Sequence, residues 1–229
     1  MERGSEQLAR LQRFAGLVGE PRRDVPLDAA TAAIAAVLQG RPLDGTAAVL
    51  DELAVSCDDP TFEGLRRHLF VELAFGGHSG AYDDPQNSFL DVVLDRRRGL
   101  PILLATVMIE VGRRAGVPVV GVGMPMHFLV RSGLDDDAFV DPFTGDAFDR
   151  RGARHRFDAV TAGRVAWSEH HLDPTGSRSM VVRMLSNLRA TYERRRDPVQ
   201  RAHVAWMRSC MPELAAEAPD AVRLGAIFN

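Results

Sequence analysis

The chain has 229 residues, 45% of them hydrophobic, which is enough for one large domain, or a domain with a small annex, around a substantial core. Its formal net charge of −3 gives no electrostatic reason to expect nucleic acid or an anionic membrane as a partner. The two cysteines, Cys57 and Cys210, are too few for a disulfide framework or a thiolate metal site.

The start of the chain, MERGSEQLARLQRF, lacks the apolar core of a signal peptide. The longest mainly apolar run, residues 100–111, is interrupted by Glu110 and is too short to span a bilayer. No H-E-x-x-H zinc motif occurs, and the neighbours His170 and His171 would face apart on any regular element. We therefore expect a cytoplasmic protein without a metal or another cofactor.

The first eighty residues predict helices. Residues 1–25 are polar and arginine-rich, and we expect a flexible, loosely held segment there. Residues 26–40, 43–57 and 59–77 each place apolar side chains at helical spacing. After a loop, residues 87–99 predict a short helix with Asn87 as its N-cap.

Residues 100–115 predict the central helix of the fold. Pro101 suits the first helical position because its missing N–H would be unpaired there in any case. Gly116 suits the C-cap, and Pro118 prevents continuation. Apolar residues cover more than one face of this segment, which indicates a buried helix.

Branched and aromatic residues predict strands over 118–124, 127–131 and 137–143, with a weaker one near Ala147–Phe148. We interpret residues 150–178 as irregular or weakly helical.

Residues 179–212 predict two helices joined at Asp197-Pro198, an αα-hairpin about as long as one tetratricopeptide repeat. The expected inward residues of the second helix are Val199, Ala202, Trp206 and Cys210. A last short helix is expected within 213–229.

One histidine and one aspartate are placed together by the strand spacing. Residues 132–136 form a link that fits a hairpin, and a symmetric pairing sets His127 opposite Asp141. A carboxylate there can accept the imidazole N–H and fix its tautomer. The pair suits either a general base or a purely structural contact that closes the hairpin.

The sequence resembles the transglutaminase-like superfamily of the SirB type in the run from YDDPQNSFLDVVLDRRRGLP to HFLVR, followed by VDPFTG. The later segment MVVRMLSNLRATY is similar to the segment that follows the core in that family. The resemblance covers roughly residues 45 to 212. It implies an α+β fold with a papain/transglutaminase-like core, in which the buried central helix packs on a small antiparallel sheet. It further implies N-terminal helices and a C-terminal helical hairpin.

The resemblance also implies a domain division and a site. Residues 26–178 would hold a helical lead-in and the core, and residues 179–229 a tetratricopeptide-like tail. His127 and Asp141 match the superfamily's catalytic histidine and aspartate. The cysteine position falls at about Pro101 to Leu103, where this chain has no thiol and Leu103 replaces a serine common in relatives. Met126 stands where relatives usually have glycine, and Asn87 joins Pro101, Leu103 and Met126 in the expected binding cleft.

No other residue offers a convincing nucleophile. We interpret Cys57 and Cys210 as structural thiols, Ser88 as a helix-cap residue, and Thr106 as bonded to the carbonyl four residues before it.

The favoured hypothesis is therefore a pseudoenzyme without transglutaminase or cysteine-protease activity, which binds a protein, a peptide or a small molecule. The alternatives are an enzyme that uses His127 and Asp141 in thiol-independent amide or ester chemistry, and an interaction module built on the tail.

Overall fold

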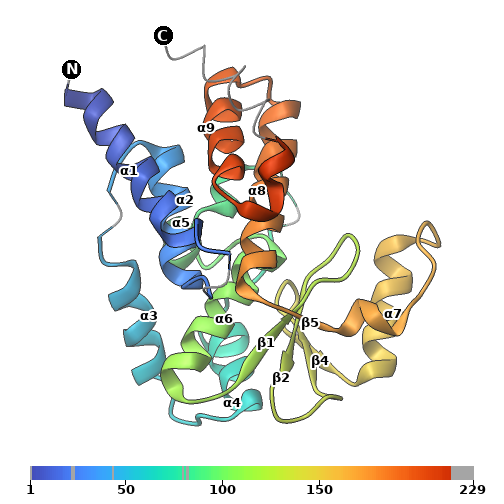
Figure 1. Cartoon of the computed structure of the whole chain (residues 1–229). Helices are drawn as coiled ribbons and strands as arrows, with labels where there is room; N and C mark the ends of the chain where they lie inside the picture. The colour runs from blue at the N-terminus through green and yellow to red at the C-terminus, as the bar shows by residue number, and fades with distance from the viewer. Residues whose placement is uncertain (1, 22–23, 43, 79, 81–82, 218–229) are drawn as a thin grey trace. The chain divides into compact units, whose positions relative to one another are not determined.

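The computed structural model describes residues 2–21, 24–42, 44–78, 80 and 83–217. The chain divides into two compact units (Figure 1). Unit 1 comprises Met1–Asp44, Ser88–Asp91 and Ser177–Asn229, and unit 2 comprises Gly45–Asn87 and Val92–Gly176. Both ends of the chain thus belong to one unit. The division into residues 1–25, 26–178 and 179–229 stays a prediction of domain organisation.

Unit 1 is built from helices of both chain ends. They are α1 (Glu2–Val18), α2 (Leu27–Gln39), α8 (Ser177–Arg194), α9 (Pro198–Ser209) and the short 3-10 helix η5 (Pro212–Glu217). Helix α2 packs against α1, α8 and α9. Helix α1 buries Phe14 and Val18 completely, so it is a packed element where the sequence suggested a loosely held segment.

The predicted helical hairpin is present as α8 and α9. Asp197 caps α9 by accepting from the backbone N–H of Gln200, and Pro198 takes the first helical position as predicted. The predicted inward face of α9 was partly wrong, because Val199 is 44% exposed while Val204 and Met207 are buried. Residues 218–229 of the expected last helix lie outside the described residues.

The middle of the chain supplies the helices α3 (Thr46–Val55), α4 (Phe62–Arg66), α5 (Leu90–Arg96), α6 (Pro101–Ala115) and α7 (Arg150–Thr161). Short helical turns are η1 (Arg67–Glu72, a π-helix), η3 (Pro85–Ser88) and η4 (Glu169–Leu172). Asn87 lies in η3 rather than at the N-cap of α5, because the α-helix begins at Leu90.

Helix α6 is the buried centre of unit 2, as predicted. Pro101 starts it, Gly116 ends it in the left-handed conformation, and most of its side chains are buried. Gly112 allows its close approach to the following strand, because a Cβ there would lie 2.8 Å from the Val117 carbonyl oxygen.

The sheet of unit 2 has five strands in the order β4-β3-β2-β1-β5, with antiparallel neighbours. The strands are β1 (Val119–Val122), β2 (Leu129–Ser132), β3 (Phe139–Asp141), β4 (Asp146–Phe148) and β5 (Pro174–Thr175). Helix α6 packs against β1 and β2. The predicted α+β class with a buried helix on a small antiparallel sheet is therefore confirmed.

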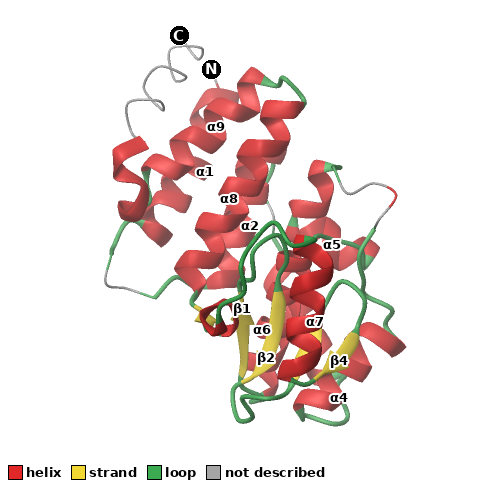
Figure 2. Cartoon of the chain, turned by 90° about the vertical axis from the view of Figure 1, so that its right-hand side faces the viewer, coloured by secondary structure: helices red, strands yellow, loops and turns green. Residues whose placement is uncertain are grey.

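Helix α7 corrects the interpretation of residues 150–178. Asp149 caps it through the backbone N–H of Gly152, and Ala153 and Phe157 are buried at helical spacing. Ala153 and Phe157 form a core cluster with Val122, Leu129 and other residues of the sheet. Figures 1 and 2 together show α6 and α7 on opposite faces of the sheet.

Candidate functional site

His127 and Asp141 are in direct contact. His127 Nε2 lies 2.8 Å from Asp141 Oδ2, in a hydrogen bond or ion pair. The histidine side chain is 11% exposed and the aspartate side chain is fully buried. The structure thus brings together the two residues that the sequence spacing paired, and the carboxylate fixes the orientation of the imidazole.

The contact arises from a different register than predicted. Val130 pairs with Val140 and Arg131 with Phe139, so β3 is displaced by two residues from the predicted pairing, and His127 precedes β2. Because side chains alternate along a strand, a displacement by two keeps each residue on its predicted face. His127 therefore reaches Asp141 from the connection before β2.

Asp141 is surrounded by donors. The guanidinium Nε of Arg156 lies 3.1 Å from Oδ2, the same oxygen that His127 contacts. The backbone N–H of Phe143 donates to Oδ1 at 2.9 Å. Asp141 lies two residues after Phe139 on β3, so both side chains point to the same face of the sheet. Phe139 belongs to the core cluster that includes Ala153 and Phe157 of α7, so the Asp141 carboxylate faces the helix that carries Arg156. Arg156 also contacts Asp146 Oδ2 at 3.1 Å.

Sequence reasoning missed Arg156, because it did not identify α7. The signal was present, since Asp149 as an N-cap precedes Ala153, Phe157 and Thr161, which are spaced four residues apart.

An aromatic ring packs beside the histidine. The rings of Phe143 and His127 meet edge to face, with centroids 6.4 Å apart. The backbone N–H of Gly77 donates to the Phe143 carbonyl at 2.8 Å. A Cβ at Gly77 would lie 2.1 Å from the Phe143 ring, so only glycine lets this ring take its place. Gly77, which the sequence indicated only as a helix end, thus positions a neighbour of His127.

The expected nucleophile position is occupied by apolar side chains. Pro101, Ile102 and Leu103 form the first turn of α6 and are buried. The backbone N–H of Leu100 donates to the Asn87 carbonyl at 3.0 Å, which holds the 3-10 turn η3 against the start of α6. Asn87 is also buried. Three of the four predicted cleft residues, Asn87, Pro101 and Leu103, therefore present little surface to a ligand.

Met126, the fourth predicted cleft residue, is different. This residue is 54% exposed, and it directly precedes His127. Its φ angle of 63° lies in the left-handed region that favours glycine. This conformation fits the glycine that the resemblance implies for this position.

The other nucleophile candidates have structural contacts. Thr106 Oγ1 donates to the Ile102 carbonyl at 2.8 Å, as predicted. Cys57 Sγ donates to the Asp59 carbonyl, and burial raises the pKa of its thiol. Burial also raises the pKa of Cys210 to about 11. Both thiols are therefore protonated and weakly nucleophilic at neutral pH.

Two further features concern metals and membranes. In the described part of the chain, no group of three or more His, Cys, Asp or Glu side chains is arranged to hold a metal ion. Of the helices that the structure describes, none is long and apolar enough to cross a membrane.

A family comparison matches residues 27–186 to the transglutaminase-like superfamily. The chain belongs to this superfamily. The match confirms the resemblance carried by the motifs around His127, although it begins before and ends before the range expected from those motifs. No solved structure matches the chain.

Curated relatives support the same placement. A UPF0162 protein of Xylella fastidiosa is 41% identical over 133 residues, which are 56% of this chain and 47% of the relative. A UPF0162 protein of Vibrio cholerae is 27% identical over 135 residues, 56% of this chain and 48% of the relative. Human F-box only protein 21 is 29% identical over 79 residues, 34% of this chain and 13% of that protein. The chain spans about half the length of the UPF0162 relatives it matches here.

Proposed function

We propose that this transglutaminase-like protein performs no catalysis at the position of the family's active site and instead binds a ligand there, as a binding or regulatory protein. Its ligand would be a protein, a peptide or a small molecule in the cytoplasm. The rim formed by Met126 and His127 would contact this ligand, and the helical hairpin α8–α9 would offer a further surface for partners.

One observation carries the proposal. Covalent acyl transfer needs a nucleophile that a base can activate. At the start of α6 the chain presents Pro101, Ile102 and Leu103, which are buried and have neither a thiol nor a hydroxyl. The first turn of α6 therefore gives His127 and Asp141 no nucleophile to activate. Met126 contributes exposed apolar surface, and methionine adapts well to varied ligands.

A ligand screen tests this proposal. Peptides and small molecules are added to the full chain, and ligands that raise its melting temperature are collected. Met126→Lys places a charge on the exposed rim, so such ligands should no longer raise the melting temperature of this variant. Leu8→Lys is the control, because Leu8 is 53% exposed, about as much as Met126, and lies on α1 in the other unit. Ligands that bind wild type and Met126→Lys equally would contradict the proposed rim.

A second candidate function is supported by the 2.8 Å contact between His127 and Asp141. An oriented imidazole can act as a general base on water or on a bound substrate. Asp141 would hold the orientation of the His127 imidazole, which would carry the proton transfer in thiol-independent amide or ester hydrolysis. This candidate requires that the rate of hydrolysis falls by at least about 100-fold in His127→Ala. Circular dichroism would show that the variant is folded. Equal hydrolysis by the variant would eliminate it.

A further inference from the structure

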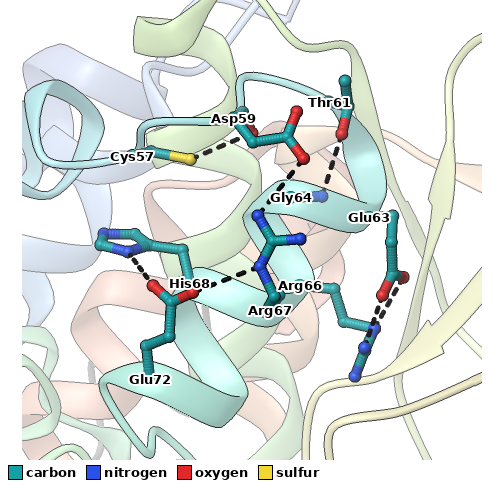
Figure 3. A network of polar contacts seen from close by, with 9 residues as sticks. All are labelled: Cys57, Asp59, Thr61, Glu63, Gly64, Arg66, Arg67, His68 and Glu72. Atoms are coloured by element: carbon teal, nitrogen blue, oxygen red, sulfur yellow. Dashed lines mark hydrogen bonds and ion pairs between the residues drawn. The ribbon is translucent and has the colours of Figure 1, made fainter.

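A second histidine bridges a carboxylate and a hydroxyl in unit 2. His68 lies in η1, and its Nδ1 is 3.1 Å from Glu72 Oε2. Its other ring nitrogen, Nε2, is 3.1 Å from the hydroxyl oxygen of Ser56, which follows α3. Figure 3 shows the His68 ring directed at the Glu72 carboxylate. One imidazole therefore connects a hydroxyl to an acid through opposite nitrogens.

The bonding partners determine the tautomer of neutral His68. The hydrogen bond from His68 lowers the pKa of Glu72, so this carboxylate is ionised at neutral pH. An ionised carboxylate only accepts hydrogen bonds, so the proton of neutral His68 lies on Nδ1. The lone pair is then on Nε2, where it can accept the Ser56 O–H. This is the arrangement in which an imidazole can remove a hydroxyl proton.

The surrounding contacts hold the acid and the base in place. Arg67 Nε contacts the second oxygen of Glu72 at 3.2 Å, and Arg67 Nη2 lies 3.4 Å from Asp59 Oδ2 (Figure 3). His68 is buried, and its carbonyl accepts from the backbone N–H of Leu73 five residues later. Such π-helical turns occur frequently at functional sites.

The hydroxyl is accessible and has two acceptors within reach. Ser56 is exposed, and its Oγ lies 3.1 Å from both His68 Nε2 and the Leu53 carbonyl oxygen. The imidazolium formed by proton transfer would lie beside Glu72 and near the C-terminal end of α3. Both the carboxylate and the negative end of the helix dipole stabilise a positive charge there.

We propose that Ser56 is a nucleophile that takes an acyl group from an ester, with His68 as its base and Glu72 as the residue that positions His68. The Ser56 oxygen forms a bond to the ester carbonyl carbon as its proton passes to His68 Nε2. The bond from that carbon to the alcohol oxygen then breaks, and His68 returns the proton to the departing alcohol. Water attacks the acyl-serine by the same steps in reverse, which releases the acid and restores the hydroxyl.

The surroundings indicate the class of ester. Val55 and Val71, which neighbour Ser56 and Glu72 in the chain, are 86% and 59% exposed. Asp58, Asp59 and Glu72 give this region negative charge. Burial is the main cause of the raised pKa of the neighbouring Cys57 thiol, and these three carboxylates raise it further. Apolar surface and negative charge favour a neutral ester with a short apolar acyl group over an anionic substrate.

Covalent labelling of the full chain tests the proposal. The probe is a fluorophosphonate, whose phosphorus forms a bond to an activated serine oxygen and loses fluoride. Peptide mapping should find the adduct on Ser56, and no adduct should form in Ser56→Ala. The rate of labelling should fall by at least about 100-fold in His68→Gln, because glutamine cannot act as the base. With p-nitrophenyl butyrate, the wild type should release nitrophenolate and the Ser56→Ala variant should not.

Ser209 provides a matched control within the chain. It ends α9, and its Oγ donates to the carbonyl of Trp206 three residues earlier, as Ser56 can to Leu53. Ser209→Ala should therefore leave labelling unchanged. A chain without an adduct on Ser56, or with one that forms equally fast in folded His68→Gln, would overturn the proposal.

The outcome is separable from the function proposed for the rim at Met126 and His127. Ester turnover that persists in Ser56→Ala and is lost in His127→Ala would belong to the other histidine. Ligand binding that depends on Met126 is measured without an ester and is independent of Ser56.

Discussion

Asp141 holds a negative charge that has no access to solvent. Its Oδ2 contacts His127 and Arg156, and its Oδ1 accepts from the backbone of Phe143. A buried carboxylate is stable only where such partners replace water. The same contacts determine the position of His127, so the stability of this region and the orientation of the histidine depend on one side chain.

Asp141→Ala should lower the free energy of unfolding by about 3 kcal/mol, because it leaves the His127 imidazole and a backbone donor without their acceptor. Asp146→Ala is the control, since Asp146 contacts the same arginine but its side chain is 62% exposed. That change should cost at most about 1 kcal/mol. Urea denaturation followed by circular dichroism measures both values. Equal losses would show that burial of Asp141 does not control its contribution.

Met126 has a backbone conformation that its side chain disfavours. At its φ of 63°, an L-residue is less stable than glycine by about 1 kcal/mol. Met126→Gly should therefore be more stable than Met126→Ala by about 1 kcal/mol, although both remove the exposed thioether and glycine gains more entropy on unfolding. Thermal denaturation compares the two. If alanine were as stable as glycine, Met126 would not be strained.

At the scale of single elements, α6 combines an apolar surface with one buried acid. Glu110 accepts from Arg114 at 2.7 Å and from Arg113 at 2.9 Å, both within the last turn. Arg114 also reaches Asp51 on α3 at 2.6 Å. These contacts bring cations to the negative end of α6 and tie α3 to it.

Glu110→Gln should lower the free energy of unfolding by about 2 kcal/mol, because the hydrogen bonds from Arg113 and Arg114 lose the buried charge that strengthens them. Asp51→Asn removes the other acid of the same arginine, but its side chain is 65% exposed, so the loss should be about 0.5 kcal/mol. Chemical denaturation of both variants provides the comparison. A larger loss in Asp51→Asn would mean that the exposed pair carries the contact.

The central helix was predictable because its signals are local. Pro101 and Gly116 determine its ends, and its apolar surface on all sides identifies it as buried. Helix α7 was not identified, since most of its residues are polar and only Ala153, Phe157 and Thr161 are buried. Its N-cap and four-residue spacing are local signals, but which surface of the sheet it covers depends on tertiary packing.

The candidate site was predictable to the same extent. The pairing of His127 with Asp141 follows from alternation along strands, which tolerates the two-residue error in register. Arg156, Phe143 and Gly77 could not be assigned to it, because they come from other elements whose packing brings them there. The contact between Ser56 and His68 likewise depends on how the end of α3 meets a π-helical turn.

At the scale of the molecule, the two ends of the chain build one unit. Gln7 on α1 connects two other helices, because its side-chain Nε2 donates to the Val37 carbonyl on α2 and lies 3.0 Å from His203 Nε2 on α9. Its Oε1 accepts from Arg10. These partners fix the amide orientation of Gln7, so the His203 Nε2 must accept. The His203 Nδ1 then carries the proton and faces Gln200 Oε1 at 3.3 Å.

This arrangement makes unit 1 sensitive to acid. Burial lowers the pKa of His203 below its ordinary value of 6.5, and the donor of Gln7 gives a further reason for the neutral form. The unfolded chain therefore binds a proton at a higher pH than the folded chain does. The stability that neutral His203 contributes is present above the His203 pKa of the unfolded chain, about 6.5. It is lost as the pH falls from there through the lower His203 pKa of the folded chain.

Wild type should therefore lose stability in urea between pH 7.5 and pH 5, whereas His203→Gln, which cannot gain a proton, should lose less. Gln7→Ala separates the two causes, because it removes the donor and leaves the histidine in place. Its acid sensitivity should lie between those of wild type and His203→Gln. An equal loss of stability in wild type and His203→Gln would mean that other groups control the acid response. Glu213 does not act in this pH range, because its hydrogen bond with Arg178 lowers its pKa and its contribution is lost only below pH 4.5.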